Sequence, residues 1–290
     1  MSVKLPRLKP APVPTVHPVP EYKADARLAA VYDDTKAVLQ VPWMGVVTMA
    51  FAHYPTFYDT LWGGLRELAA SREFVDACAG LRAHADAEVA QLSPNPLAST
   101  LDELGYAGRE IGDIRAMIEI FSHGNMPYLM IATAARLLLE EHELGAGATV
   151  TPFAGRHGPT QERTLTLIEP HHADAPTQAV YNDIKATLGL PFVNTDYRAL
   201  ARWPSYFARA WSDLAPKVFS REYEPCVTSV HDYAVREMRR LANPGELTPA
   251  QLRAAAMHDA PLDEVLDVVR LFQWLLPGLI SNVAYFRAQL

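Results

Sequence analysis

Asp196 is the first candidate for chemistry, because it is a carboxylate at a position where an internal copy of the sequence has an apolar residue. Residues 179–211 repeat residues 30–62 at a fixed offset of 149, and Val47 is the partner of Asp196 in that alignment. A scaffold that accepts valine here does not need a carboxylate for folding. We therefore interpret Asp196 as a general base that faces a pocket.

Asn125 is the second candidate, and it too replaces an apolar residue of the repeat. It lies in FSHGNMPYLMIATA (121–134), whose counterpart FQWLLPGLISNVAY (272–285) has Leu276 at that position. Glycine and proline both weaken helices. The Gly-Asn-x-Pro sequence therefore allows two predictions. One is a kink between two helices, with the Asn125 side chain hydrogen-bonded to its own backbone. The other is a break in the helix that directs the side-chain amide of Asn125 into a cavity. Together, the two polar residues favour one site between the halves.

Other patterns of catalytic residues are incomplete. The ten histidines include no HExxH motif and no pair at ligand spacing, so no metal site is predicted. P-loop, GxGxxG and GxSxG motifs are also missing. Cys78 with His84 resembles the thiol site of alkylhydroperoxidase-like helical proteins, but the second thiol of a CxxC pair is missing. A thiol-dependent activity is therefore the weaker alternative.

The elements predicted to position both candidates are helices. Apolar residues recur at helical spacing, and prolines stand where helices must end. No run of β-alternation appears, so we predict an all-α fold of two tandem copies of one helical repeat, packed as a pseudo-dimer. A short helical segment begins at Asp196. The longer predicted helices span residues 24–39, 56–70, 72–92, 109–141, 177–188, 206–218, 221–241, 249–258 and 262–288.

The repeat divides the chain into four segments. We predict an extended proline-rich arm over residues 1–21, a first repeat over 22–144, a Gly/Pro-rich linker over 145–176 and a second repeat over 177–290. The linker is long for a structureless connection, so we expect it to wrap around the surface. The two repeats should form one compact unit with the active site between them.

Composition and charge exclude several classes of protein. The net charge of −7 comes without a basic block, which argues against nucleic acid as a partner. The apolar stretches are shorter than about 18 residues, so we predict no transmembrane helix and no membrane partner. The N-terminus lacks the apolar core of a signal peptide, and two cysteines provide no disulfide framework. We therefore predict a cytoplasmic protein.

Three segments of the chain resemble the group I 2-haloacid dehalogenases, the DehI-type enzymes that act on both D and L substrates. They are VPWMGV (41–46), FSHGNMPYL (121–129) and TDYRALARWP (195–204), and the similarity runs from about Tyr22 to the end of the chain. The resemblance implies an all-α pseudo-dimer of two repeats with a deeply knotted chain. We also consider assembly of the protein into a homodimer.

The resemblance also implies roles for individual residues. It places the catalytic aspartate at Asp196 and the water-holding asparagine at Asn125. Val46 stands where the family has an aromatic residue and Thr195 where it has serine, so the pocket volume and the preferred substrate differ. The residues implied to line the substrate pocket are Trp43, Val46, Tyr128, Asn194, Thr195 and Trp274.

The implied reaction is the hydrolysis of a short 2-haloalkanoic acid to a 2-hydroxy acid, with no metal and no organic cofactor. Asp196 would accept a proton from a water that Asn125 holds, so that the water attacks C2 directly and inverts it. Both enantiomers would react if each can present its back face to that water. The substrate carboxylate is expected on backbone N–H groups at the helix start near Thr195 and Asp196. Because Asp196 would repel it at close range, the two carboxylates must point to opposite sides of the pocket.

The competing class is a non-catalytic helical scaffold or a small-acid binding protein. In that interpretation Asn194 or Thr195 caps a helix, and Asp196 only interacts favourably with the helix dipole. Release of halide from a 2-haloacid distinguishes the two classes.

Overall fold

The computed structural model describes residues 5–159 and 164–290, and these residues form an all-helical fold with a single isolated β-bridge between Ser71 and Pro152. The predicted fold class is therefore confirmed. The helices of the first half are α1 (Ala26–Leu39), α2 (Val46–Phe51), α3 (Pro55–Ala69), α4 (Arg72–Ala90), α5 (Ala98–Glu103) and α6 (Gly108–Leu139), preceded by a 3₁₀ turn, η1 (Glu21–Lys23). Those of the second half are α7 (Ala175–Leu188), α8 (Thr195–Leu200), α9 (Pro204–Val218), α10 (Tyr223–Arg240), α11 (Pro249–Asp259) and α12 (Leu262–Ala288).

The helices recur in the order and at the spacing that the internal repeat predicts. The helices α1, α2 and α3 begin 149 residues before α7, α8 and α9, respectively. The same local signals delimit α1 and α7. Asp25 accepts a hydrogen bond from the backbone N–H of Leu28, and Asp174 caps α7 in the same way. Superposition of the halves, the pseudo-dimer and the knot stay predictions.

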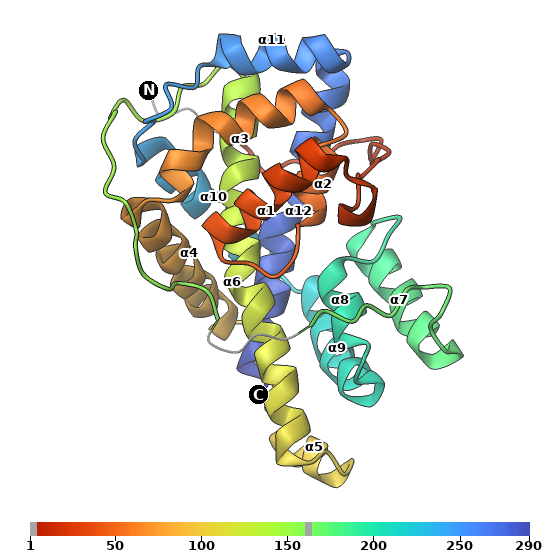
Figure 1. Cartoon of the computed structure of the whole chain (residues 1–290). Coiled ribbons are helices and arrows are strands. Elements are labelled where there is room, and N and C mark those ends of the chain that lie inside the picture. The colour runs from red at the N-terminus through yellow and green to blue at the C-terminus, as the bar shows by residue number, and fades with distance from the viewer. Residues whose placement is uncertain (1–4, 160–163) are drawn as a thin grey trace.

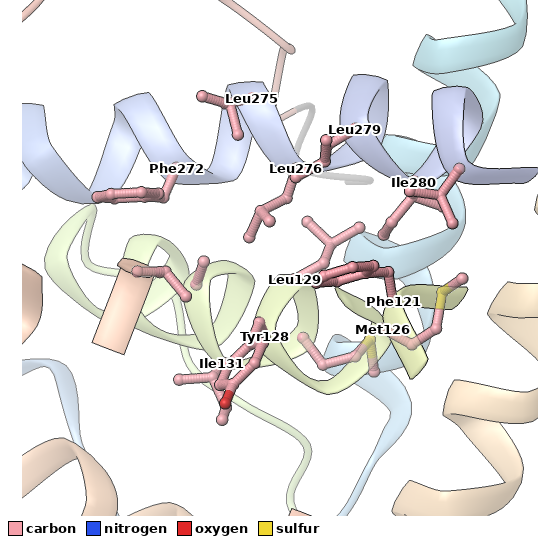
Figure 2. Packing of buried hydrophobic residues seen from close by; sticks show 14 of the residues in the cluster. Phe121, Met126, Tyr128, Leu129, Ile131, Phe272, Leu275, Leu276, Leu279 and Ile280 are labelled. Atoms are coloured by element: carbon pink, nitrogen blue, oxygen red, sulfur yellow. The ribbon is translucent and has the colours of Figure 1, made fainter. Parts of the chain in front are cut away.

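Helices α6 and α12 pack against each other through the centre of the molecule and share its most extensive contact (Figure 1). Phe121 and Leu129 of α6 project toward Leu276 of α12, whereas Tyr128 projects from the opposite side of α6 (Figure 2). Their central turns are buried, so apolar side chains surround both helices. Within the described residues, no helix is long and apolar enough to cross a membrane.

Helix α6 continues without interruption through the Gly-Asn-x-Pro sequence, so both the kink between two helices and the break predicted there are wrong. Proline removes only one backbone donor, that of Pro127. Packing on all sides of this segment outweighs its low helix propensity. Gly124 has a packing role, because a Cβ atom there would lie 2.3 Å from the Trp43 ring.

The segments outside the helices lie against them. The linker pairs with the turn between α3 and α4, where the Arg72 N–H donates to Thr151 O and the Phe153 N–H to Ala70 O. Further along, the side chain of Gln40 accepts the backbone N–H groups of His157 and Gly158. Figure 1 shows the linker running along the first half before it reaches α7.

Replacing Gly124 with alanine should destabilise the protein. The added Cβ would overlap the Trp43 ring, which is held edge-on by Phe121 and Tyr128. We expect the free energy of unfolding to fall by about 1–3 kcal/mol, as is typical of an overpacked core. Urea denaturation measures this change.

Gly112→Ala is the matched control, because Gly112 lies in the same helix with nothing within 4 Å of its would-be Cβ. That variant should gain up to about 1 kcal/mol from the better helix propensity of alanine. Equal stability changes for the two variants would contradict the packing role of Gly124.

Candidate active site

Asn125 and Asp196 lie in direct contact between the two halves of the chain. Asn125 is on α6 and Asp196 is the second residue of α8, and the Nδ2 of Asn125 donates a 2.7 Å hydrogen bond to Oδ1 of Asp196. Both side chains are buried, with 4% and 3% of their residue surfaces exposed. The two polar members of the repeat therefore form one pair.

The carboxyl group of Asp196 is poised between its protonated and ionised forms. Burial raises its pKa to about 6, although the hydrogen bond from Asn125, its own backbone N–H and the positive charge of Arg198 all favour the ionised form. At neutral pH it is mostly ionised and still basic enough to accept a proton. This is the property required of a general base.

The start of α8 does not show the side-chain caps that the alternative interpretation requires. Asn194 occupies the N-cap position but its side chain makes no capping hydrogen bond. The Thr195 hydroxyl instead accepts a 3.2 Å hydrogen bond from Nη2 of Arg198. Side-chain capping therefore does not explain Asn194 or Thr195, whereas Asp196 does lie in the first turn of α8, where a carboxylate interacts favourably with the helix dipole.

An aromatic wall stands beside the pair. The Trp43 ring packs edge-on against Phe121 at 5.1 Å and Tyr128 at 5.9 Å between ring centroids. Trp43 packs over Gly124, the residue that precedes Asn125 in α6. The Tyr128 hydroxyl donates to the backbone oxygen of Trp43 at 2.7 Å, so Tyr128 fixes the wall and has no free hydroxyl hydrogen for a ligand.

Four of the six expected pocket residues are divided between two cavities, whereas Tyr128, like Asn125 and Asp196, is among the lining residues of neither. Trp43 and Thr195 line a large cavity of about 960 Å³, which is also bordered by the linker. Asn194 and Trp274 line a smaller cavity of about 180 Å³. Val46, half-buried at the start of α2, is among the lining residues of neither.

Sequence reasoning missed the ion pair next to Asp196. Arg198 donates to both carboxylate oxygens of Glu169 at 2.7 and 2.8 Å, which ties α8 to the end of the linker. A signal was present in the sequence, because the repeat partner of Arg198 is Met49. Like Asp196, Arg198 is a charged residue in place of an apolar one.

The thiol alternative is unsupported by its surroundings. Burial raises the pKa of Cys78 above its usual range, which disfavours the reactive thiolate. His84 bonds to Ser229 and stacks on Tyr233 instead. Across residues 5–159 and 164–290, no three His, Cys, Asp or Glu side chains come together in a group that could hold a metal ion.

Comparison with known proteins points to one family. The family model described as "Halocarboxylic acid dehydrogenase DehI" matches residues 42–191. An "(R)-2-haloacid dehalogenase" of Rhizobium sp. (strain NHG3) is 45% identical, over 84% of this chain and 95% of that protein. An "(R)-2-haloacid dehalogenase" of Pseudomonas putida is 35% identical, over 99% of this chain and 97% of that protein. A solved D-2-haloacid dehalogenase mutant, in complex with D-2-CPA, is 35% identical and covers 95% of this chain and 96% of that chain, with a TM-score of 0.84.

Replacing Asp196 with asparagine should change how stability depends on pH. Burial raises the pKa of Asp196 in the folded protein to about 6, above the value of about 3.8 that is usual for an exposed aspartate. Between these values the folded protein binds more protons than the unfolded chain, so the free energy of unfolding falls as pH rises through this window. Above pH 6 the buried Asp196 is ionised, and its ionisation lowers the free energy of unfolding by roughly 2–3 kcal/mol.

Asp196→Asn removes that titration, while its side-chain oxygen can still accept the hydrogen bond from Asn125. We therefore expect the stability of this variant relative to wild type to rise by about 2–3 kcal/mol between pH 4 and pH 8. Urea denaturation of both proteins at the two pH values measures the difference, since the other groups titrate alike in both. A constant difference would show that Asp196 keeps its ordinary pKa.

Proposed function

Because the chain belongs to the DehI family of 2-haloacid dehalogenases, hydrolases that act on carbon–halide bonds, we propose that it converts short 2-haloalkanoic acids to 2-hydroxy acids at the Asn125–Asp196 pair. The observation that carries the choice of residues is the buried 2.7 Å hydrogen bond between them. It joins two positions at which a polar residue of one copy replaces an apolar residue of the other.

The free oxygens of the pair are suited to hold one water. Oδ1 of Asp196 accepts from Asn125, which leaves Oδ2 to accept a proton. The amide oxygen of Asn125 is a second acceptor on the same pair. A water that donates one hydrogen to each of these oxygens directs its lone pair away from them, toward the C2 atom of the substrate. Attack in line with the carbon–halogen bond then releases halide and transfers the proton to Asp196.

Direct attack by water fits this site better than an ester intermediate on Asp196. Hydrolysis of an ester would need a second base to activate water. The nearest partner, Asn125, cannot accept a proton usefully, and Glu169 is engaged by Arg198. One displacement by water inverts the configuration at C2.

The (R)-enantiomer is the substrate that we propose first. The two relatives described above are named for it, and their identities of 45% and 35% extend over most of the chain. Activity on both enantiomers, which the resemblance to the group I enzymes implied, requires that each can present its back face to the same water. Halide release from (R)- and (S)-2-chloropropionate tests this. A binding protein would bind the acids and release no halide.

Substitutions of the pair should separate catalysis from folding. We expect Asp196→Ala and Asp196→Asn to abolish halide release, because neither side chain can accept the proton of the water. Asn125→Ala should lower kcat about a hundredfold, a loss typical of a misplaced reactant.

In the wild type, kcat/KM should rise with pH through about 6 as Asp196 ionises.

Asp76→Asn is the control for loss of a carboxylate, because Asp76 is exposed on α4. It should keep wild-type turnover. Wild-type halide release by either Asp196 variant would exclude Asp196 as the base.

A further inference from the structure

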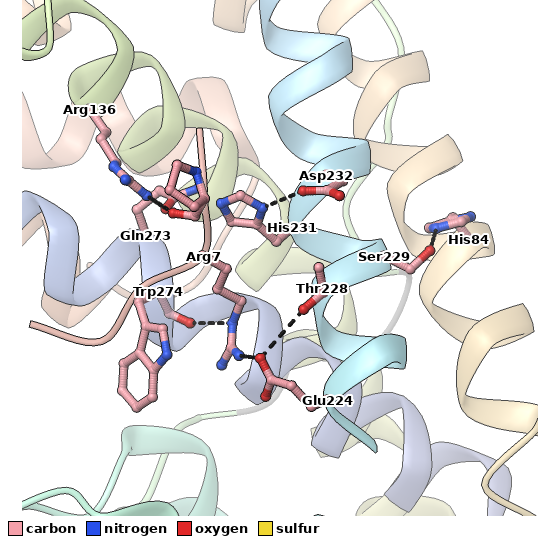
Figure 3. Close-up of polar contacts among 11 residues, drawn as sticks. Arg7, His84, Arg136, Glu224, Thr228, Ser229, His231, Asp232, Gln273 and Trp274 are labelled. Carbon is pink, nitrogen blue, oxygen red and sulfur yellow. Dashed lines mark hydrogen bonds and ion pairs between the residues drawn. The ribbon is translucent and has the colours of Figure 1, made fainter. Parts of the chain in front are cut away.

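The N-terminal arm supplies one wall of the smaller cavity. Arg7 projects from the arm onto α12 and α10, and 7% of its side chain is exposed (Figure 3). Its Nε donates to the backbone oxygen of Trp274 at 3.0 Å, and its Nη1 pairs with Glu224 at 2.6 Å. The guanidinium also lies 5.2 Å from the centre of the Trp274 ring. These contacts fix the guanidinium in one orientation.

The remaining nitrogen of Arg7 is available to a ligand. Within the described residues, no hydrogen-bond partner is assigned to Nη2. It lies 3.6 Å from the position that a Cβ atom would occupy at Gly278, which also lines the cavity. A glycine at this point leaves open space beside a buried cation.

The opposite wall of the cavity belongs to the helix that carries the proposed base. Asn194 and Tyr197 line the cavity, and they flank Thr195 and Asp196 along the chain. The Asn194 amide makes no capping bond, so it can also bind a ligand. A volume of about 180 Å³ suits a small acid, since pockets for drug-sized ligands measure roughly 300–1,000 Å³.

We infer that Arg7 binds the carboxylate of the 2-haloacid through Nη2, with the Asn194 amide as a second donor, so that the N-terminal arm is part of the active site. This inference rests on the proposed function. It also addresses an electrostatic problem of the site, since the ionised Asp196 repels a substrate carboxylate and a buried cation offsets that repulsion. Glu224 neutralises Arg7 only in part, because 65% of its side chain is exposed and its charge is screened by solvent.

Arg7→Gln tests the inference, with Lys9→Gln as the matched control. Lys9 lies on the same arm, 5.1 Å from the centre of the Trp274 ring, but it donates to the backbone of Gly189 and does not line the cavity. Three quantities are measured for each protein: KM and kcat for 2-chloropropionate, the ratio of kcat/KM between 2-chloropropionate and 2-chloropropionamide, and the affinity for lactate by calorimetry.

We expect Arg7→Gln to raise KM and weaken lactate binding by roughly 10- to 100-fold, the loss expected for one charge-assisted hydrogen bond. Its preference for the acid over the amide should fall by a similar factor, which a purely structural role would not produce. Lys9→Gln should stay within about twofold of wild type. Unchanged KM, lactate affinity and acid preference in Arg7→Gln would overturn the inference, as would equal losses in Lys9→Gln.

Two further outcomes keep the test decisive. If the wild type releases no halide, the proposed function fails, while lactate binding that depends on Arg7 and not on Lys9 still supports carboxylate recognition. If Arg7→Gln does not fold, Arg7→Lys is measured in its place. Its single ammonium cannot serve Trp274, Glu224 and the substrate together, so KM should rise severalfold at unchanged kcat. A wild-type KM in that variant would overturn the inference.

Discussion

A carboxylate buried between two helices is the constraint on which the site depends. Removing the charge of Asp196 from water is costly, and the hydrogen bond from Asn125 offsets part of that cost. The bond requires α6 to run unbroken through a sequence that is poor for helix formation, so that Asn125 faces α8. Packing of α6 against α12 and of Trp43 against Gly124 supplies the stability that the local sequence lacks.

The two halves show how one arrangement of helices can serve both stability and chemistry. The contact between α6 and α8 carries the polar pair, whereas Leu276 on α12 and Val47 on α2 stand at the corresponding repeat positions. Arg198, in place of Met49, adds a cation that stabilises the ionised form of Asp196 and holds the linker through Glu169. The polar groups are thus concentrated in one of two similar contacts.

Most of the fold could be predicted from the sequence, because long amphipathic helices have strong periodic signals. Predicted helices such as 109–141 and 262–288 agree with α6 and α12 to within a few residues. The short helices α2 and α5 were not predicted, since six residues give too little periodicity. The continuity of α6 at Gly124 was missed because tertiary packing decides it.

The residues of the Asn125–Asp196 pair could be predicted from the internal repeat, but the residues that surround the pair could not. Comparison of the copies singled out Asn125 and Asp196, and could also have found Arg198. Arg7 lies in the arm, outside the two predicted repeats, and 267 residues separate it from Trp274, so no local pattern predicts their contact. The division of the pocket residues between two cavities likewise depends on how the arm and linker pack.

The central claim, that Asp196 activates water and is not itself the nucleophile, is tested most directly by a single turnover in ¹⁸O-water with enzyme in excess over 2-chloropropionate. We expect the label in the hydroxyl group of lactate after that one turnover, and none in the Asp196 carboxylate after many turnovers. Unlabelled lactate from the single turnover, with label accumulating in Asp196 over repeated turnovers, would contradict the account and establish an ester intermediate.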